Sequence, residues 1–168
     1  MANSFVRYTG NGSTSTYSIP FSYRSTADLS ATVAGVNTTF SLNAAGTTLT
    51  FASPPANLAA VEIRRKTSQT SRLTDYASGS VLTESDLDTD STQAFMMSQE
   101  AIDSADDVIK ISNTDFQYDA TSKQIRNVTD PTSAQDVATK AYTDSILTTN
   151  TTAVSNATAQ ANAAAASA

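Results

Sequence analysis

The chain has 168 residues, 39% of them apolar, and it contains no His, Cys or Trp. Without Cys there is no disulfide framework and no Cys-ligated metal site, and without His and Cys the Ser-His-Asp, Cys-His and His-based metal mechanisms are excluded. The net charge of −6 is unevenly divided. Residues 1–73 carry six basic and two acidic side chains, whereas residues 74–168 carry four basic and fourteen acidic ones. The acidic half argues against nucleic acid as a partner, because the phosphate backbone would repel it.

Residues 4–66 show the pattern of short β-strands. Two apolar runs flank the turn residues 10–12, which predicts a hairpin because Gly and Asn tolerate positive φ. Turn signals recur every 8–12 residues or so, which is typical of a small antiparallel sandwich or barrel. The predicted core is thin, so we expect a sister chain or another protein to complete it. Its members are Phe5, Tyr17, Ile19, Phe21, Leu29, Val33, Phe40, Leu42, Leu49, Phe51, Val61 and Ile63.

The stretch 61–87 separates this strand pattern from a helical one. It begins as an alternating strand, with Val61 and Ile63 on one face and Glu62 and Arg64 on the other. It holds four of the ten basic residues of the chain. A junction with so much charge, between two architectures, indicates a docking surface more than a catalytic pocket.

A helix is predicted from Thr83 to about Ile111. The sequence of residues 83–86 resembles a capping box, with acidic residues where the helix dipole favours them. Phe95, Ile102 and Ile109 recur at intervals of seven, and the small residues Ser98 and Ala105 follow the first two by three positions. This spacing fits a seam for self-association, and it fits equally well a helix packed on the sheet of its own chain.

A break at 112–131 is predicted to hold a linker and a short strand or hook that ends at Asp130-Pro131. The next helix is predicted over 132–168, capped by Thr132 with Gln135 at the reciprocal position. Tyr142 and Ile146 lead its possible seam, which weakens along the Ala-rich end. The chain stops inside this pattern, so we expect an N-terminal portion of a longer protein or a short adaptor.

Two sets of motifs resemble phage fibre proteins. The strings Ile19-Pro20-Phe21-Ser22-Tyr23, E-I-R-R-K-T at 62–67, R-L-T-D-Y at 72–76 and G-S-V-L at 79–82 resemble the N-terminal tail-attachment domain of tail fibre proteins from short-tailed phages. The resemblance covers roughly residues 5–108. Residues 127–144 resemble the N-V-x-D-P-T-x-A-Q-D-A-A-T-K-x-Y-V-D element of many phage fibres, departing from it at Val137 and Thr143.

The resemblance implies a structural virion protein in the phage tail. In that family the domain attaches a homotrimeric fibre to tail tube, adaptor or nozzle proteins, and distal regions beyond this chain bind the host receptor. The implied fold is α+β, with a small antiparallel sandwich-like domain followed by long helices in a trimeric coiled coil or bundle. The implied parts are a β-rich tail-attachment domain at 1–80, a helix at 81–111, a linker at 112–131 and the Ala-rich start of a trimeric shaft at 132–168.

Neither a membrane span nor a signal peptide is predicted, because the chain has no run of 18 apolar residues and Met1 is followed by no basic and apolar leader. We therefore expect assembly in the host cytoplasm and residence in the virion tail.

The candidate site residues are for binding, and we expect no catalytic residue, cofactor or metal. Tail docking is assigned to Arg64, Arg65, Lys66, Arg72, Asp75 and Tyr76. On this strand Arg64 and Lys66 point one way, and Arg65 is expected to pair within the domain with a carboxylate such as Asp75. The trimer seam is assigned to Phe95, Ile102, Ile109, Tyr142 and Ile146. Ordinary edge-strand charges that discourage aggregation would give the same basic cluster.

Other functions have weaker support. Tyrosines suited to stacking on sugars would make the chain a stand-alone carbohydrate-binding adhesin: Tyr8, Tyr17, Tyr23 and Tyr76. A depolymerase would need a pair such as Asp103 and Asp107 in a groove, and no groove is indicated. The run Asp86-x-Asp88-x-Asp90 lacks the glycine and the bidentate Glu of a calcium loop.

Overall fold

A computed structural model describes residues 3–167 of the chain. It contains two units, one that ends at Val108 and one that begins at Ile109. The elements of the first unit are β1 (Phe5–Thr9), β2 (Thr16–Ser18), a 3-10 turn (Thr26–Asp28), β3 (Leu29–Val33), β4 (Val36–Asn37), β5 (Phe40–Leu42), β6 (Thr48–Phe51), β7 (Ala60–Arg65) and α1 (Glu84–Asp106). Those of the second are β8 (Lys110–Ile111), β9 (Tyr118–Asp119) and α2 (Lys140–Ala166).

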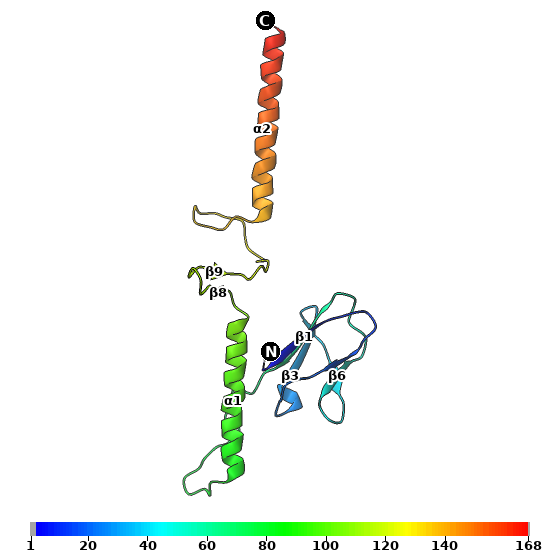
Figure 1. Cartoon of the computed structure of the whole chain (residues 1–168), viewed down its shortest axis with the longest axis vertical. Coiled ribbons are helices and arrows are strands. Elements are labelled where there is room, and N and C mark those ends of the chain that lie inside the picture. The colour runs from blue at the N-terminus through cyan, green and yellow to red at the C-terminus, as the bar shows by residue number, and fades with distance from the viewer. Residues whose placement is uncertain (1–2, 168) are drawn as a thin grey trace. The chain divides into compact units, whose positions relative to one another are not determined.

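The strands of the first unit form two antiparallel sheets (Figure 1). One has the order β1-β7-β3-β4 and the other the order β2-β6-β5. We call the part of the chain that carries these sheets, residues 3–67, the head. With helix α1 beside it, the unit is of the α+β class, as predicted.

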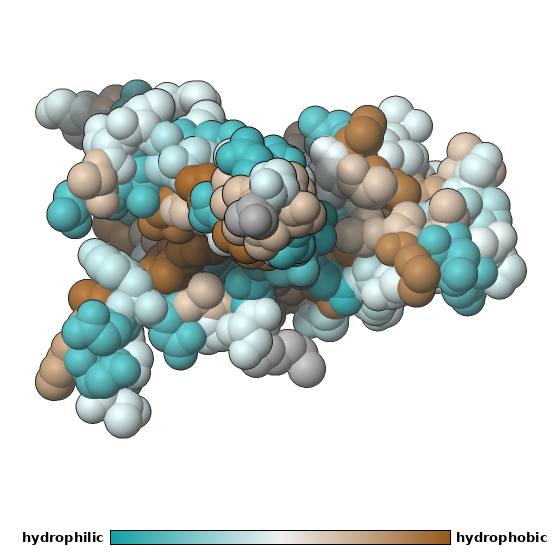
Figure 2. Space-filling view, turned by 90° about the horizontal axis from the view of Figure 1, so that it is seen from above, coloured by the Kyte–Doolittle hydropathy of each residue, from teal (hydrophilic) through white to brown (hydrophobic). Residues whose placement is uncertain are grey.

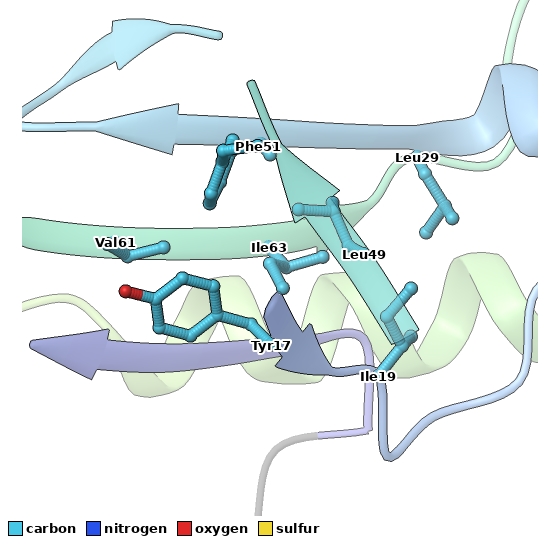
Figure 3. Packing of buried hydrophobic residues seen from close by; sticks show 8 residues of the cluster. Tyr17, Ile19, Leu29, Leu49, Phe51, Val61 and Ile63 are labelled. Carbon is cyan, nitrogen blue, oxygen red and sulfur yellow. The ribbon is translucent and has the colours of Figure 1, made fainter. Parts of the chain in front are cut away.

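The head is held together by apolar side chains between the two sheets, and Figure 3 shows Tyr17, Ile19, Leu49 and Phe51 approaching Leu29, Val61 and Ile63. Strand β7 supplies the pattern: Val61, Ile63 and Arg65 are buried, whereas Glu62 and Arg64 alternate with them and are half-exposed. Most of the predicted core is confirmed, and Ala31 joins it. Phe5 does not, because its ring lies under the guanidinium groups of Arg7 and Arg64.

The hairpin predicted across residues 10–12 is wrong. Strand β1 pairs with β7 and β2 pairs with β6, so the turn connects the two sheets instead of two neighbouring strands. Its own contacts explain this course: the Gly10 N–H donates to the Ala59 carbonyl, and a Cβ at Gly10 would lie 2.4 Å from the Ala56 carbonyl oxygen. The glycine is therefore needed for close approach to the loop before β7.

The helices begin where side chains cap them, and one predicted cap is wrong. Thr83 caps α1 in a capping box with Asp86, as predicted, but the helix ends at Asp106 and not near residue 111. Helix α2 is capped by Thr139, whose hydroxyl accepts the Tyr142 N–H, and not by Thr132. The carboxylate of Asp136 accepts the N–H groups of residues 132 and 133, and this loop takes the place of the predicted first turns.

The thin core gives a first prediction. Leu49 is fully buried between the sheets, so Leu49→Ala should lower the free energy of unfolding of the first unit by about 2–5 kcal/mol. Denaturant unfolding measures this change. Val36→Ala is the matched control, because Val36 is 67% exposed and should change stability by under about 0.5 kcal/mol. Equal losses for the two variants would contradict the assigned core.

Candidate functional site

Helix α1 contacts the head through a mainly polar face. Its buried residues are Gln93, Met96, Glu100 and Asp103, and their spacing of three and four residues places them on one side of the helix. Asp107, the C-cap residue, continues the same face. We call this set of contacts the head–helix interface. Every buried side-chain nitrogen and oxygen atom among the described residues has a hydrogen-bond partner.

The centre of the head–helix interface is a buried ion pair. The Arg65 side chain is 1% exposed, and its Nε donates to Glu100 Oε1 at 2.8 Å. The other guanidinium nitrogens donate to the carbonyl oxygens of Ser22 and Met96 and to Gln99 Oε1. Glu100 also accepts the N–H and the hydroxyl of Thr67. Arg65 thus joins the head to α1, and each of its guanidinium nitrogens donates a hydrogen bond.

A second contact fixes the N-terminal end of the head. Oδ2 of Asp103 accepts the N–H groups of Asn3 and Ser4 at 2.8 and 2.6 Å, and the Ser4 hydroxyl at 2.6 Å. Ser4 is fully buried, and its carbonyl accepts the Arg65 N–H. The start of β1 is therefore tied to the helix and to β7 at the same point.

The third contact lies at the C-terminal end of the helix. Asp107 accepts two hydrogen bonds from Arg7, at 2.9 and 2.7 Å, and one from Arg64 at 3.2 Å. Glu62 bridges the same two arginines from the sheet. The hydrogen bonds from Arg7 lower the pKa of Asp107, and those from Arg64 lower the pKa of Glu62, while the carboxylates raise the pKa of both arginines.

The fourth contact holds the loop between the head and the helix. The Gln93 amide donates to the carbonyl oxygens of Ser68 and Ser71 and accepts the Leu73 N–H. Farther along, the hydroxyl of Tyr76 donates to the Asp86 carbonyl. This loop therefore lies against the first half of α1.

The structure places the predicted docking residues in two groups. Arg64 and Arg65 belong to the head–helix interface, and the expected partner of Arg65 was wrong: Glu100 pairs with it, whereas Asp75 pairs with Arg72 at 3.0 Å. Lys66, Arg72, Asp75 and Tyr76 lie at the surface. Docking through these residues stays a prediction.

The predicted seam residues are exposed. In the first unit Phe95 and Ile102 are 63% and 58% exposed, and Phe95 borders a hollow at the edge of the head–helix interface, beside Pro20 and Phe21. In the second unit Ile109, Tyr142 and Ile146 are 48%, 37% and 44% exposed. Hydrophobic residues, coloured brown, lie among hydrophilic ones at the surface in Figure 2. Their role in a trimer stays a prediction.

The tyrosines and aspartates considered for other functions are buried or make contacts within the fold. Tyr17 is buried, and the hydroxyls of Tyr8 and Tyr23 donate to backbone carbonyls. Asp103 and Asp107 hold the head–helix interface. Within residues 3–167 no cluster of three or more acidic side chains is arranged to hold a metal ion.

Comparison with known proteins agrees with the motifs. The model of the phage T7 tail fibre protein N-terminal domain matches residues 1–120. The chain belongs to this family. Its relatives include the tail fibre proteins of Escherichia phage T7 and Enterobacteria phage T3, each 33% identical over 132 residues, or 73% of this chain and 24% of the relative. A capsule KN4-specific depolymerase of Klebsiella phage KN4-1 is 38% identical over 85 residues, or 50% of this chain and 10% of the relative.

This tail fibre chain is a structural component of the virion tail. It spans about a quarter of the length of the tail fibre proteins it matches and a tenth of the depolymerase. In the described part of the tail fibre chain, no helix is both long and apolar enough to cross a bilayer.

Sequence reasoning missed the head–helix interface, although two signals in the tail fibre sequence point to it. Gln93, Glu100 and Asp107 recur at intervals of seven, which is a polar stripe where an amphipathic helix usually has an apolar one. Asp103 and Asp107 also lie in the last turn of a helix, where the dipole disfavours negative charge unless a donor compensates it.

The buried ion pair gives a second prediction. Glu100→Ala should lower the free energy of unfolding by about 3–5 kcal/mol, because it leaves the Arg65 charge buried without its partner. Arg72→Ala removes an exposed pair and should cost under about 1 kcal/mol. Chemical denaturation of both variants, followed by circular dichroism, compares the two losses. Similar small losses would mean that Glu100 does not hold the helix.

The third prediction concerns acid. Because Arg7 lowers the folded pKa of Asp107, this carboxylate stabilises the fold above its unfolded pKa of about 3.9, and the stabilisation is lost as pH falls through the folded pKa. Asp107→Asn should therefore be less stable than the wild type near neutral pH and nearly equal to it below pH about 2. Asp88→Asn, on the exposed side of α1, is the control. A gap that persists in acid would contradict this assignment.

Proposed function

We propose that this chain is the attachment end of a homotrimeric tail fibre. The head fixes the fibre to the tail, and the helices bring three chains together and lead toward distal regions that bind the host receptor. The chain acts mechanically, with no catalytic centre of its own. Membership of the tail fibre family and the exposed apolar helices support this proposal.

The observation that carries the trimeric part is the second unit. Among its described residues, 109–167, no side chain is buried, although α2 alone has 27 residues. A lone helix is marginal in water, and most helical stability in proteins comes from burying an apolar face. The exposed apolar residues of α2 are therefore the surface that sister chains would cover: Tyr142, Ile146, Leu147 and Val154.

The head suits an attachment role because its arrangement on α1 is fixed by directional contacts. Charged and polar groups at four places along the head–helix interface set the rotation of the head about the axis of α1 and its position along that axis. A rigid unit of this kind transmits force from the tail to the fibre without needing a flexible contact. The exposed residues Lys66, Arg72, Asp75 and Tyr76 remain the candidates for contact with protein partners.

The depolymerase relative does not change this proposal for the chain itself. The match covers a tenth of that protein, so most of the depolymerase has no counterpart in the match and its activity is not carried over to this chain. The carboxylates that an enzyme would need, Asp103 and Asp107, are engaged by Ser4 and Arg7. A shared attachment end joined to different distal parts accounts for both kinds of relative.

Two measurements test the proposal, and together they make the fourth prediction. Light scattering of the chain should give three times its 17.6 kDa mass. The labelled chain should also co-sediment with purified tails of the parent phage that lack fibres, and unlabelled chain should compete for them. Ile146→Asp should lower the trimer fraction at least about tenfold, whereas Val36→Asp, an exposed site on the head, should leave it unchanged.

The outcomes separate the parts of the proposal. A monomer that binds tails would remove the trimer and leave attachment. A trimer that does not bind fibreless tails would remove attachment. Activity on capsule polysaccharide by the chain alone would overturn the mechanical role.

A further inference from the structure

Helix α1 has an exposed side that is organised in three strips. With about 100° per residue, the side opposite the head–helix interface carries small residues: Ser91, Ala94, Ser98, Ala101 and Ala105. Phe95 and Ile102 lie on one flank of this strip and Met97 lies on the other. Small residues in the middle allow helices to approach closely, and the larger residues on the flanks are then placed to touch neighbouring helices.

The flank with Met97 borders a groove between α1 and the loop that leaves the head. Two open hollows of about 370 and 460 Å³ follow one another along the helix and share Gln69 and Met97. On the helix side the lining includes Ala94, Met97 and Ala101. On the loop side it includes Lys66 and Arg72. The helix side also carries Asp90, Gln93, Glu100 and Ser104, so the groove has an apolar strip within a polar lining and basic side chains on its loop side.

We propose that this groove receives Phe95 and Ile102 from the α1 helix of a second copy of the chain. Each copy offers its Phe95 flank to one neighbour and its groove to the other, so the contact is heterologous and closes after three copies into a ring. The proposal rests on the homotrimer proposed above and adds that the loop that leaves the head, residues 66–72, forms half of each contact.

The charges agree with this occupant. The loop side carries Lys66 and Arg72. Arg72 pairs with Asp75 at 3.0 Å, whereas Lys66 forms no ion pair among the described residues. The helix that would lie beside it is acidic at its start, and Asp88 lies in line with Phe95 and Ile102 at the heptad interval. In a parallel arrangement Asp88 approaches the Arg72 end of the neighbour's groove. Residues on the flanks of a coiled-coil seam commonly pair by charge in this way.

Burial of apolar side chains would stabilise this contact between copies. Phe95 is 63% exposed and Ile102 is 58% exposed, and removing this apolar surface from water favours association. Each copy contributes both residues, so the ring covers six large side chains that one copy alone leaves in water. The small central strip contributes little area, so the flanks carry most of the association.

Introduced cysteines test the contact directly, because the chain has no native Cys. Met97→Cys and Ile102→Cys are combined in one chain. The two positions lie on opposite flanks of the helix, so they are too far apart to bridge within a chain, since a disulfide needs Cβ atoms about 4 Å apart. Between copies each groove contact brings one of each together. Mild oxidation should therefore link all three chains, which denaturing gel electrophoresis shows as a covalent trimer.

The controls are the single variants and the pair Val36→Cys with Ile102→Cys, which should give no covalent trimer. Light scattering before oxidation and circular dichroism establish that each variant is folded and assembled. Covalent pairs from Ile102→Cys alone would place Ile102 on the three-fold axis and overturn the groove contact. A trimer that the double variant does not link would also overturn it, leaving the homotrimer intact. A monomeric wild type would instead refute the homotrimer itself.

Discussion

The guanidinium of Arg65 is the group on which the arrangement of the first unit depends. An arginine on the inward face of β7 is costly to bury unless its donors find acceptors. The head supplies one, the Ser22 carbonyl, and helix α1 supplies the rest through Met96, Gln99 and Glu100. The donors of Arg65 are therefore satisfied only when α1 lies against the head at one rotation and one position along its axis.

A polar interface of this kind defines orientation better than an apolar one would. The head has a small core, and α1 adds only one buried apolar side chain, Met96. Apolar contacts could be made with the helix shifted or turned, because they have no direction. The contacts of Asp103 with Ser4 and of Asp107 with Arg7 have one geometry each, so a shift by one turn would break all of them together.

Local patterns predicted much of this fold. The alternation in β7 and the capping box at Thr83 depend on neighbouring residues, and both predictions are confirmed. What failed depended on distant partners. The hairpin predicted at Gly10 is wrong because nothing in the residues of the turn indicates that β1 pairs with β7. Arg65 was given Asp75 as a partner because the two are close in sequence, whereas Glu100 comes to it only through the fold. The helix predicted to begin at Thr132 is a loop there, because Asp136 accepts the N–H groups of residues 132 and 133.

Helix α1 reverses the usual arrangement of an amphipathic helix, and this reversal links the fold to its role. Soluble helices normally bury their apolar side and expose their polar side. Here Gln93, Glu100 and Asp103 are buried, whereas Phe95 and Ile102 face water. The polar residues are satisfied by the head, so the same helix has its large apolar residues available for another surface. In the proposed trimer, the contacts within each chain and the contacts between chains lie on opposite sides of this helix. Under that proposal each head holds its own helix while three helices meet, so the contacts of Arg65, Asp103 and Asp107 are kept when three chains assemble.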